Sequence, residues 1–273
     1  MSSPLSSALA PATALLAARR MVPGAIAHAP ASLWRVNVRG APVPAVLGGP
    51  LAAGTAVGLS LVAAGAGRAP ARRVAAVTGG LVLVTAVGGY VDDLRGDEPA
   101  RGFRGHLGAL ASGRITGGVV KMAAGGLGGL AAGAALEGPR GAAGIGTIVA
   151  LSANLVNLLD RAPGRAGKAS ALAATSLIMA GDRSWSGSGA VLLGAVMGCL
   201  PADLGERAML GDAGADPLGA AVGLGLALAT RGRSRGVAIG ALGVLNAASE
   251  RWSFSEVIAR HAWLRRLDRL GRA

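Results

Sequence analysis

The chain has 273 residues, of which 52% are hydrophobic and only 15% are charged, and its mean hydropathy is +0.51. Soluble domains carry about 25% charged residues, so this composition favours an integral membrane protein and leaves a soluble Ala/Gly-rich protein as the alternative. The net charge of +13 would suit a nucleic-acid-binding protein, but the arginines are scattered between apolar runs without an interleaved aromatic surface. We therefore expect basic loops that anchor a membrane protein, and no nucleic-acid partner.

Apolar runs between charged breaks predict a single all-α domain over residues 1–250, a polytopic helix bundle with about nine (eight to ten) transmembrane helices. Its 46 glycines suit membrane helices that pack closely through small residues. Residues 251–273 predict a basic amphipathic helix on the cytoplasmic membrane surface. The expected segments are roughly 5–28, 45–67, 74–91, 115–136, 141–159, 169–181, 187–201, 217–230 and 236–249.

The charges of the loops predict the orientation of the bundle. If every segment spans and the N-terminus is outside, the loops after odd-numbered segments and the tail hold 16 of the Lys and Arg residues, and the other loops hold eight. This bias places the odd loops in the cytoplasm of a multi-pass protein of the cell (inner or plasma) membrane. Of the 14 acidic residues, only Glu137 and Asp182 fall on the other side. Acids that gather at helix ends repel one another, so we expect a cation or a bound partner there.

The first two candidate stretches surround the second and third segments. The loop NVRGAPVPAVLGG, Asn37 to Gly49, predicts a rigid turn before a membrane helix. The third segment ends on Asp92 and Asp93, which offer hard oxygen ligands for Mg²⁺ near the membrane surface. Two solvated acids in a polar loop are the alternative. Lys121 is the only lysine inside a segment and could meet a lipid phosphate, or else extend to the interface like other membrane lysines.

Two further stretches follow later in the chain. In SANLVNLLDRAPGRAGK, Asn154, Asn157 and Asp160 recur every three residues and so share one helix face that ends at the cytoplasm. In MLGDAGADPLG, Asp212 lies in a turn between Gly211 and Gly214, where glycines allow a phosphate to approach the backbone and a helix N-terminus favours an anion. A helix N-cap is the structural alternative for Asp212.

In their order along the chain, these stretches resemble the polyprenyl-phosphate N-acetylhexosamine-1-phosphate transferases, the MraY and WecA family of membrane enzymes (glycosyltransferase family 4). RGAPVPAVLGG is similar to the Gly/Pro loop of the family, VDD to its Asp pair, NLVNLLD to its Asn-x-x-Asn-x-x-Asp, and LGDAGADPLG to its Gly-Asp-x-Gly-Ser turn. The resemblance covers about residues 35 to 220. It implies transfer of a sugar-1-phosphate (N-acetylhexosamine or MurNAc type) from a UDP-sugar to polyprenyl phosphate, with Mg²⁺ and release of UMP, in cell-envelope polysaccharide or peptidoglycan (cell-wall) biosynthesis.

The resemblance also implies roles for individual residues. Asp92, Asp93, Asp160 and Asp212 would form the catalytic group, with Asp212 and Asp93 as the Mg²⁺ ligands and Asp92 orienting or deprotonating the lipid phosphate. Phosphoryl transfer depends on positioning and charge neutralisation, which fits these residue types. Substrate would contact Asn154, Asn157, Arg161, Arg165, Lys121, Gly211 and Gly214. Arg104 and Arg114 extend this set to a basic rim, for which anchoring to anionic lipid is the alternative.

The departures from the family pattern keep other readings open. Pro163 stands where the family has a second acid, Ala215 stands where it has a serine, and no His-rich loop or tenth helix is recognisable. A partner or a homodimer would have to supply that helix. A catalytically degenerate relative acting as a membrane scaffold or regulator is the first alternative function. A transporter is the second, although the acids cluster at helix ends and not at the bilayer midplane.

Overall fold

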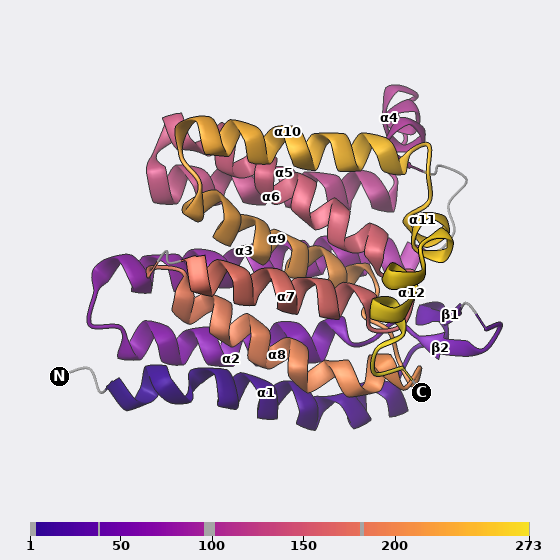
Figure 1. Cartoon of the computed structure of the whole chain (residues 1–273), viewed down its shortest axis with the longest axis horizontal. Helices are drawn as coiled ribbons and strands as arrows, with labels where there is room; N and C mark the ends of the chain where they lie inside the picture. The colour runs from indigo at the N-terminus through magenta and orange to yellow at the C-terminus, as the bar shows by residue number, and fades with distance from the viewer. Residues whose placement is uncertain (1–3, 38, 96–101, 181–182, 273) are drawn as a thin grey trace.

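A computed structural model describes residues 4–37, 39–95, 102–180 and 183–272 of the chain (Figure 1). These residues are nearly all helical, with one short turn of 3-10 helix, η1 (Ala31–Leu33), and one antiparallel hairpin of β1 (Trp34–Val36) and β2 (Pro42–Pro44). The helices are α1 (Pro4–Ala27), α2 (Gly48–Gly65), α3 (Ala69–Arg95), α4 (Gly102–Ala111), α5 (Gly117–Glu137), α6 (Pro139–Leu159), α7 (Arg165–Ala180), α8 (Ser186–Leu204), α9 (Asp212–Ala229), α10 (Gly232–Ser249), α11 (Phe254–Arg260) and α12 (Ala262–Arg269).

Each segment predicted from hydropathy coincides with one of the long helices. Five of them, α2, α3, α5, α6 and α8, are long and apolar enough to cross a membrane. A membrane helix bundle therefore agrees with the structure, while the number of crossings stays a prediction. The hairpin and α4 were not expected, because both lie in stretches that read as loops between apolar runs.

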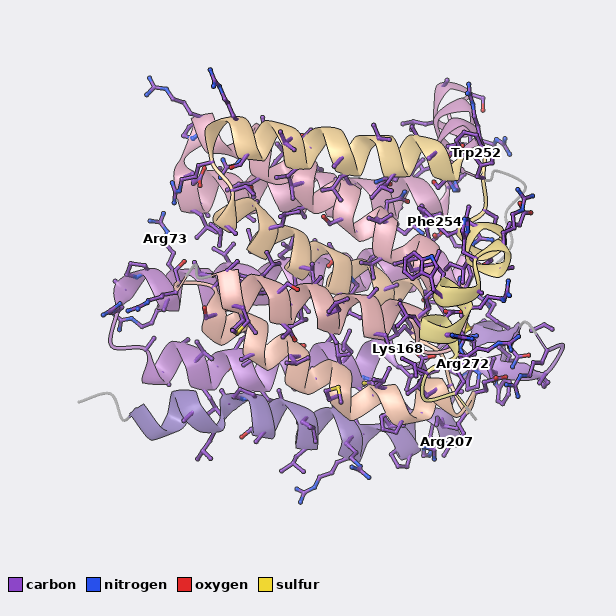
Figure 2. All side chains as sticks on the ribbon, viewed as in Figure 1. Arg73, Lys168, Arg207, Trp252, Phe254 and Arg272 are labelled. Atoms are coloured by element: carbon purple, nitrogen blue, oxygen red, sulfur yellow. The ribbon has the colours of Figure 1, made fainter. Side chains whose placement is uncertain are left out.

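The long helices lie side by side, and their connections alternate between the two ends of the bundle (Figure 1). One end carries the hairpin, α4, α11 and α12, and we call it the hairpin end. Lys168, Arg207 and Arg272 lie at the hairpin end, whereas Arg73 lies at the opposite end (Figure 2). The alternation confirms that the odd-numbered loops share one end; which end faces the cytoplasm stays a prediction.

Small residues let the outer helix α1 pack closely against α2 and α8. Gly54 and Gly58 lie four residues apart on α2 and face α1. A Cβ at Gly54 would lie 2.6 Å from the carbonyl oxygen of Ala14, so a larger residue would push the helices apart. Gly194 and Gly198 repeat this spacing on α8 and also contact α1. The small-residue faces expected from the composition are thus the helix contacts.

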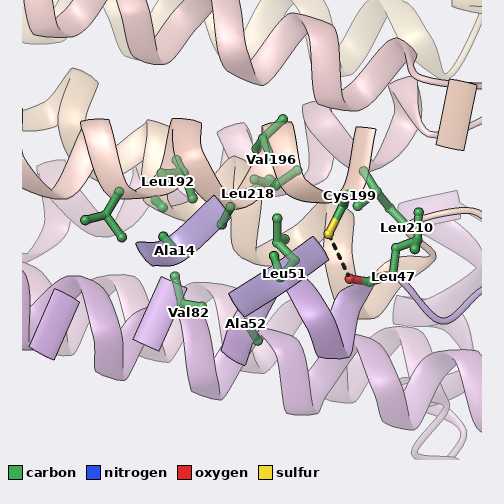
Figure 3. Close-up of a cluster of buried hydrophobic side chains, with 14 of the residues drawn as sticks. Ala14, Leu47, Leu51, Ala52, Val82, Leu192, Val196, Cys199, Leu210 and Leu218 are labelled. Atoms are coloured by element: carbon green, nitrogen blue, oxygen red, sulfur yellow. Dashed lines mark hydrogen bonds between the residues drawn. The ribbon is translucent and has the colours of Figure 1, made fainter. Parts of the chain in front are cut away.

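Helix α9 lies at the centre of the bundle and is buried along nearly its whole length. Its Leu218 packs with Leu51 of α2 and Leu192 of α8 in the main apolar cluster (Figure 3). In the same cluster the thiol of Cys199 lies 3.9 Å from the carbonyl oxygen of Leu47, a weak hydrogen bond (Figure 3). Because the core holds α9 along its length, the N-terminus of the helix has a fixed position at the hairpin end.

The tail differs from the single amphipathic helix predicted from the sequence. It forms two short helices, α11 and α12, because His261 adopts an extended conformation between them. On α12, Trp263 and Leu267 are exposed beside arginines, so the amphipathic character is present. The tail packs back onto α7 at the hairpin end.

Candidate functional site

A cavity of about 1190 Å³ opens at the hairpin end of the bundle. Its wall comes from the hairpin, from α3, α4, α5, α6, α8, α9 and α10, and from the start of the tail. The structure therefore brings together side chains that are far apart in the sequence. The predicted site residues on this wall are Asp92, Asp93, Lys121, Asn154, Asn157, Asp160, Arg161, Gly211 and Asp212.

Lys121 joins two of the predicted acids. Its Nζ lies 3.1 Å from a carboxylate oxygen of Asp92 and 2.9 Å from one of Asp212. Only 17% of the lysine side chain is exposed, because both acids pack against it. Helix α5 thus supplies a positive charge between the carboxylates of α3 and α9, and Lys121 as a ligand of a lipid phosphate stays a prediction.

Asp93 holds the N-terminus of α9. Its two carboxylate oxygens accept hydrogen bonds from the backbone N–H groups of Asp212, at 3.2 Å, and Ala213, at 2.9 Å. An anion at a helix N-terminus was expected from the sequence, but here a side chain of the chain itself takes that place. Asp93 as an Mg²⁺ ligand stays a prediction, since its geometry is that of a helix cap.

Glycines allow the backbone of α9 to approach α2 and α3. Gly211 precedes α9 with φ +66°, a conformation that favours glycine. A Cβ at Gly48 would lie 2.5 Å from the carbonyl carbon of Ala213, so the first of the two glycines after the Pro loop is needed for this contact. Gly214 packs against Gly48 and Leu210 and does not line the cavity, so the structure gives it a packing role.

The three polar residues of α6 share the cavity face, as their spacing predicted. Asn157 donates a side-chain hydrogen bond to Asp212, and Asp160 accepts one of 3.0 Å from the backbone N–H of Gly211. Asn154 instead bonds Asn246 of α10 at 2.6 Å. Burial, followed by the charges of Asp203 and Asp212, raises the pKa of Asp160 well above its usual value. The end of α6 is therefore tied to the turn before α9.

The four arginines of the predicted basic rim do not share one position in the structure. Arg161 is exposed on the cavity wall, where it could meet an anionic substrate. Arg165 is not on the wall, because it forms a two-pronged ion pair with Asp268 of α12, at 2.8 and 3.0 Å. Arg114 is exposed away from the wall, and the side chain of Arg104 lies outside the described residues. Among the arginines of this set whose side chains are described, Arg161 alone lies on the cavity wall.

The tail is fastened beside the cavity by basic residues of the turn and helix after α6. Lys168 donates to the backbone carbonyl oxygens of Leu267, Asp268 and Leu270, and so binds the C-terminal end of α12. Arg272 donates to the carbonyl oxygen of Pro163, and Figure 2 shows Arg272 and Lys168 at this end. Burial alone would raise the pKa of Asp268, but the hydrogen bonds and charge of Arg165, with Arg272 and Lys168, lower it.

The hairpin closes another side of the site. Arg35 donates to the backbone carbonyl oxygen of Asp93 at the end of α3. Asn37 bonds the carboxylate of Glu206 at 2.6 Å, which ties the hairpin to the turn before α9. Pro42 and Pro44 occur in β2, an edge strand, where the missing N–H is tolerated. The Gly/Pro stretch that read as a rigid loop is therefore a strand that positions α3 against α9.

Sequence reasoning missed four acids of the cavity wall, Asp203, Glu206, Asp216 and Glu250, of which Asp203 and Asp216 are the buried ones. Asp216 is four residues after Asp212, so the helix expected to follow the turn could have placed both on one face. Asp203 is near Asp160 only because α8 and the turn after α6 meet, and no sequence spacing indicates that. Both are buried, with exposed fractions of 3%.

The residues on the wall can be tested against the Mg²⁺ that the resemblance implies. Among the described residues, no group of three or more His, Cys, Asp and Glu side chains is already arranged around one metal position. Mg²⁺ usually takes one or two carboxylates together with substrate phosphates, so a closed protein cage is not required. Asp92, Asp212 and Asp216 are the right donor type, and Oδ2 of Asp216 is buried without a hydrogen-bond partner. The donor set therefore fits a divalent cation.

Comparison of the sequence with known protein families gives no match, and comparison with characterised proteins gives none either.

Proposed function

We propose that this chain transfers a sugar-1-phosphate, of the N-acetylhexosamine or MurNAc type, from a UDP-sugar to polyprenyl phosphate and releases UMP. The proposal is supported by one observation above the others: the Pro-rich hairpin, the Asp pair, the polar face of α6 and the Gly-Asp turn all meet at one cavity. Four stretches far apart in the sequence would have no reason to meet at one cavity unless their residues shared a role. The cavity is also at the end of apolar helices, where a lipid phosphate and a soluble nucleotide could meet.

The side chains suggest how the work would be divided. Bound Mg²⁺ would supply positive charge to the diphosphate. Asp212 is held by Lys121 and Asn157, so its carboxylate is oriented before any ligand arrives. Asp92, on the other side of Lys121, would face the lipid phosphate, which has a second pKa near ~6 and so needs no strong base at pH 7. Arg161 would meet the nucleotide-sugar from the exposed rim.

The proposal includes a location. The nine long helices would cross the cell membrane with the hairpin end in the cytoplasm. The cavity would then open to the compartment that contains the nucleotide-sugar. A reporter inserted at Gly138, the turn between α5 and α6 at the opposite end, is expected to report the outside, and one fused to the C-terminus the cytoplasm. A cytoplasmic signal from Gly138 would reverse this orientation.

A scaffold that has lost its chemistry is the second candidate. The observation that favours it is Pro163, which lies on the cavity wall where the resemblance leads us to expect an acid. Turnover separates the two candidates.

The deciding experiment is UMP release by purified full-length protein in detergent, with Mg²⁺, polyprenyl phosphate and a panel of UDP-N-acetylhexosamines. We expect release that requires both lipid and metal and falls about 10²-fold or more in Asp212→Asn, because a fixed charge at the reacting phosphate is lost. Asp92→Asn should also lower release. The matched control is Glu137→Gln at the opposite end of α5, which should keep it. UDP-sugar binding without release would favour the scaffold.

A further inference from the structure

Asp216 is a buried acid with one carboxylate oxygen that no described residue satisfies. The residue is 3% exposed and lies on the cavity wall, and its Oδ2 has no hydrogen-bond partner among the described residues. Burying a carboxylate oxygen without a partner costs free energy. Such an arrangement is retained where the group binds something that the protein alone does not contain.

The neighbouring acids do not share this condition. Asp93 and Asp160 accept hydrogen bonds from backbone N–H groups of the α9 turn. Asp203 accepts one from the backbone of Gly164. These three carboxylates are held by backbone N–H groups, which cannot turn away from them, whereas the partners of Asp212 include the side chains of Lys121 and Asn157, which can.

Three further acids of the wall, Asp92, Asp212 and Asp216, are not balanced by the positive charge of Lys121. Lys121 pairs with Asp92 and Asp212, and its charge also acts on Asp216. When the three acids are ionised, one lysine leaves a net charge of −2, which a single divalent cation would balance. Asp212 and Asp216 are one helical turn apart on α9, so both can face the same position.

We infer that Asp216 is a ligand of the divalent cation and binds it together with Asp212, whereas Asp93 serves as the cap of α9. The inference deepens the proposed function, on which the choice of Mg²⁺ rests. It moves the second metal carboxylate from α3 to α9. Because both ligands would then come from one helix, the geometry of the cation site would not depend on the exact distance between two helices.

The test is direct metal binding by the purified full-length protein in detergent, with Mn²⁺ as the probe and electron paramagnetic resonance as the readout of free Mn²⁺. We expect the wild-type protein to bind Mn²⁺ and Asp216→Asn to bind it about ten-fold more weakly or worse, because ligand charge tunes affinity for divalent cations. Asp203→Asn, a buried acid on the same wall that is already hydrogen-bonded, is the matched control and should bind as the wild type does. Unchanged binding by Asp216→Asn, or no binding by the wild type, would overturn the inference.

Thermal unfolding in the same detergent distinguishes a ligand from a structural acid. Without metal, Asp216→Asn should melt no lower than the wild type, because a buried unsatisfied charge is removed; with Mg²⁺ it should lose the stabilisation that the wild type gains. A lower melting temperature without metal would assign Asp216 to the structure and overturn the inference. Mn²⁺ binding through Asp216 without any UMP release would contradict the proposed function and leave this inference standing.

Discussion

The two ends of the helix bundle treat buried acids in opposite ways. At the far end, Glu137 is matched by arginines: Arg235 donates to both carboxylate oxygens, at 2.7 and 2.9 Å, and Arg231 lies 3.8 Å away. At the hairpin end, Asp92 and Asp212 share one lysine. The far end thus has more basic than acidic partners, and the cavity has the reverse.

This difference separates charges that satisfy one another from charges that a ligand would complete under the proposed function. A two-pronged Arg–carboxylate pair satisfies both partners and needs nothing further. Carboxylates gathered around a single lysine repel one another and are tolerated where a cation or a substrate completes them. The contrast between the ends is therefore a physical argument for function that does not depend on resemblance to any family.

The largest expected effect comes from removing the shared lysine. Lys121→Met should destabilise the protein by about 3 kcal/mol, because it leaves two buried acids without their partner. Thermal or denaturant unfolding in detergent measures the change. Mg²⁺ should restore part of the loss in this variant, since the cation replaces the missing positive charge.

The matched change at the far end is Arg235→Met. Glu137 keeps Arg231 nearby, so we expect a loss of only about 1 kcal/mol and no effect of Mg²⁺. Equal losses in the two variants, or rescue of Arg235→Met by Mg²⁺, would remove the contrast between the ends.

A smaller effect is expected from a substitution that tests how closely α2 and α9 pack at the hairpin end. Gly48→Ala would place a Cβ 2.5 Å from the backbone of Ala213, at the start of α9. Because backbone atoms must move, we expect a destabilisation of about 1–3 kcal/mol together with reduced UMP release. Unfolding and turnover are the two measurements.

Its control is the next residue in the chain. A Cβ at Gly49 meets nothing within 4 Å, so Gly49→Ala should leave stability and turnover close to those of the wild type. If both substitutions behave alike, the approach of α2 to the α9 turn does not set the geometry of the cavity.

The smallest expected effect concerns the tail and depends on pH. The pKa of Asp268 is lowered in the folded protein, so its ion pair with Arg165 contributes fully above the ordinary Asp value near ~3.9 and is lost as pH falls through the lower folded value. Hydrogen exchange of residues 254–272, corrected for intrinsic rate, should show protection at pH 7 and several-fold less in strong acid.

Asp268→Asn should release the tail at pH 7 without changing the exchange of α9, which is buried along its length. Protection of the tail in this variant equal to that of the wild type would show that Arg165 and Asp268 do not fasten it. The paired charges beside the cavity would then be incidental to the position of α12.

Much of the cavity could be predicted because its pattern is local. Asn157 and Asp160 share a face through helical spacing alone, and Gly211 directly precedes Asp212 in the chain. The same rule would have found Asp216. The pairing of Arg165 with Asp268 could not be predicted, because 103 residues separate them and no periodicity links the tail to α7. The capping of α9 by Asp93 is hidden for the same reason, since it joins residues of two distant helices.

The sequence by itself determined an apolar, helical chain with its acids at one set of loop ends, since hydropathy, helical period and loop charge are properties of neighbouring residues. The tertiary structure decided which acids are satisfied. The sequence singled out Asp93 and passed over Asp216, but the approach of α3 to the first turn of α9 gives Asp93 two backbone N–H donors. Asp216 keeps a buried oxygen with no donor among the described residues. Hydrogen bonds depend on distances of about 3 Å, and only the packing of helices far apart in the chain sets those distances.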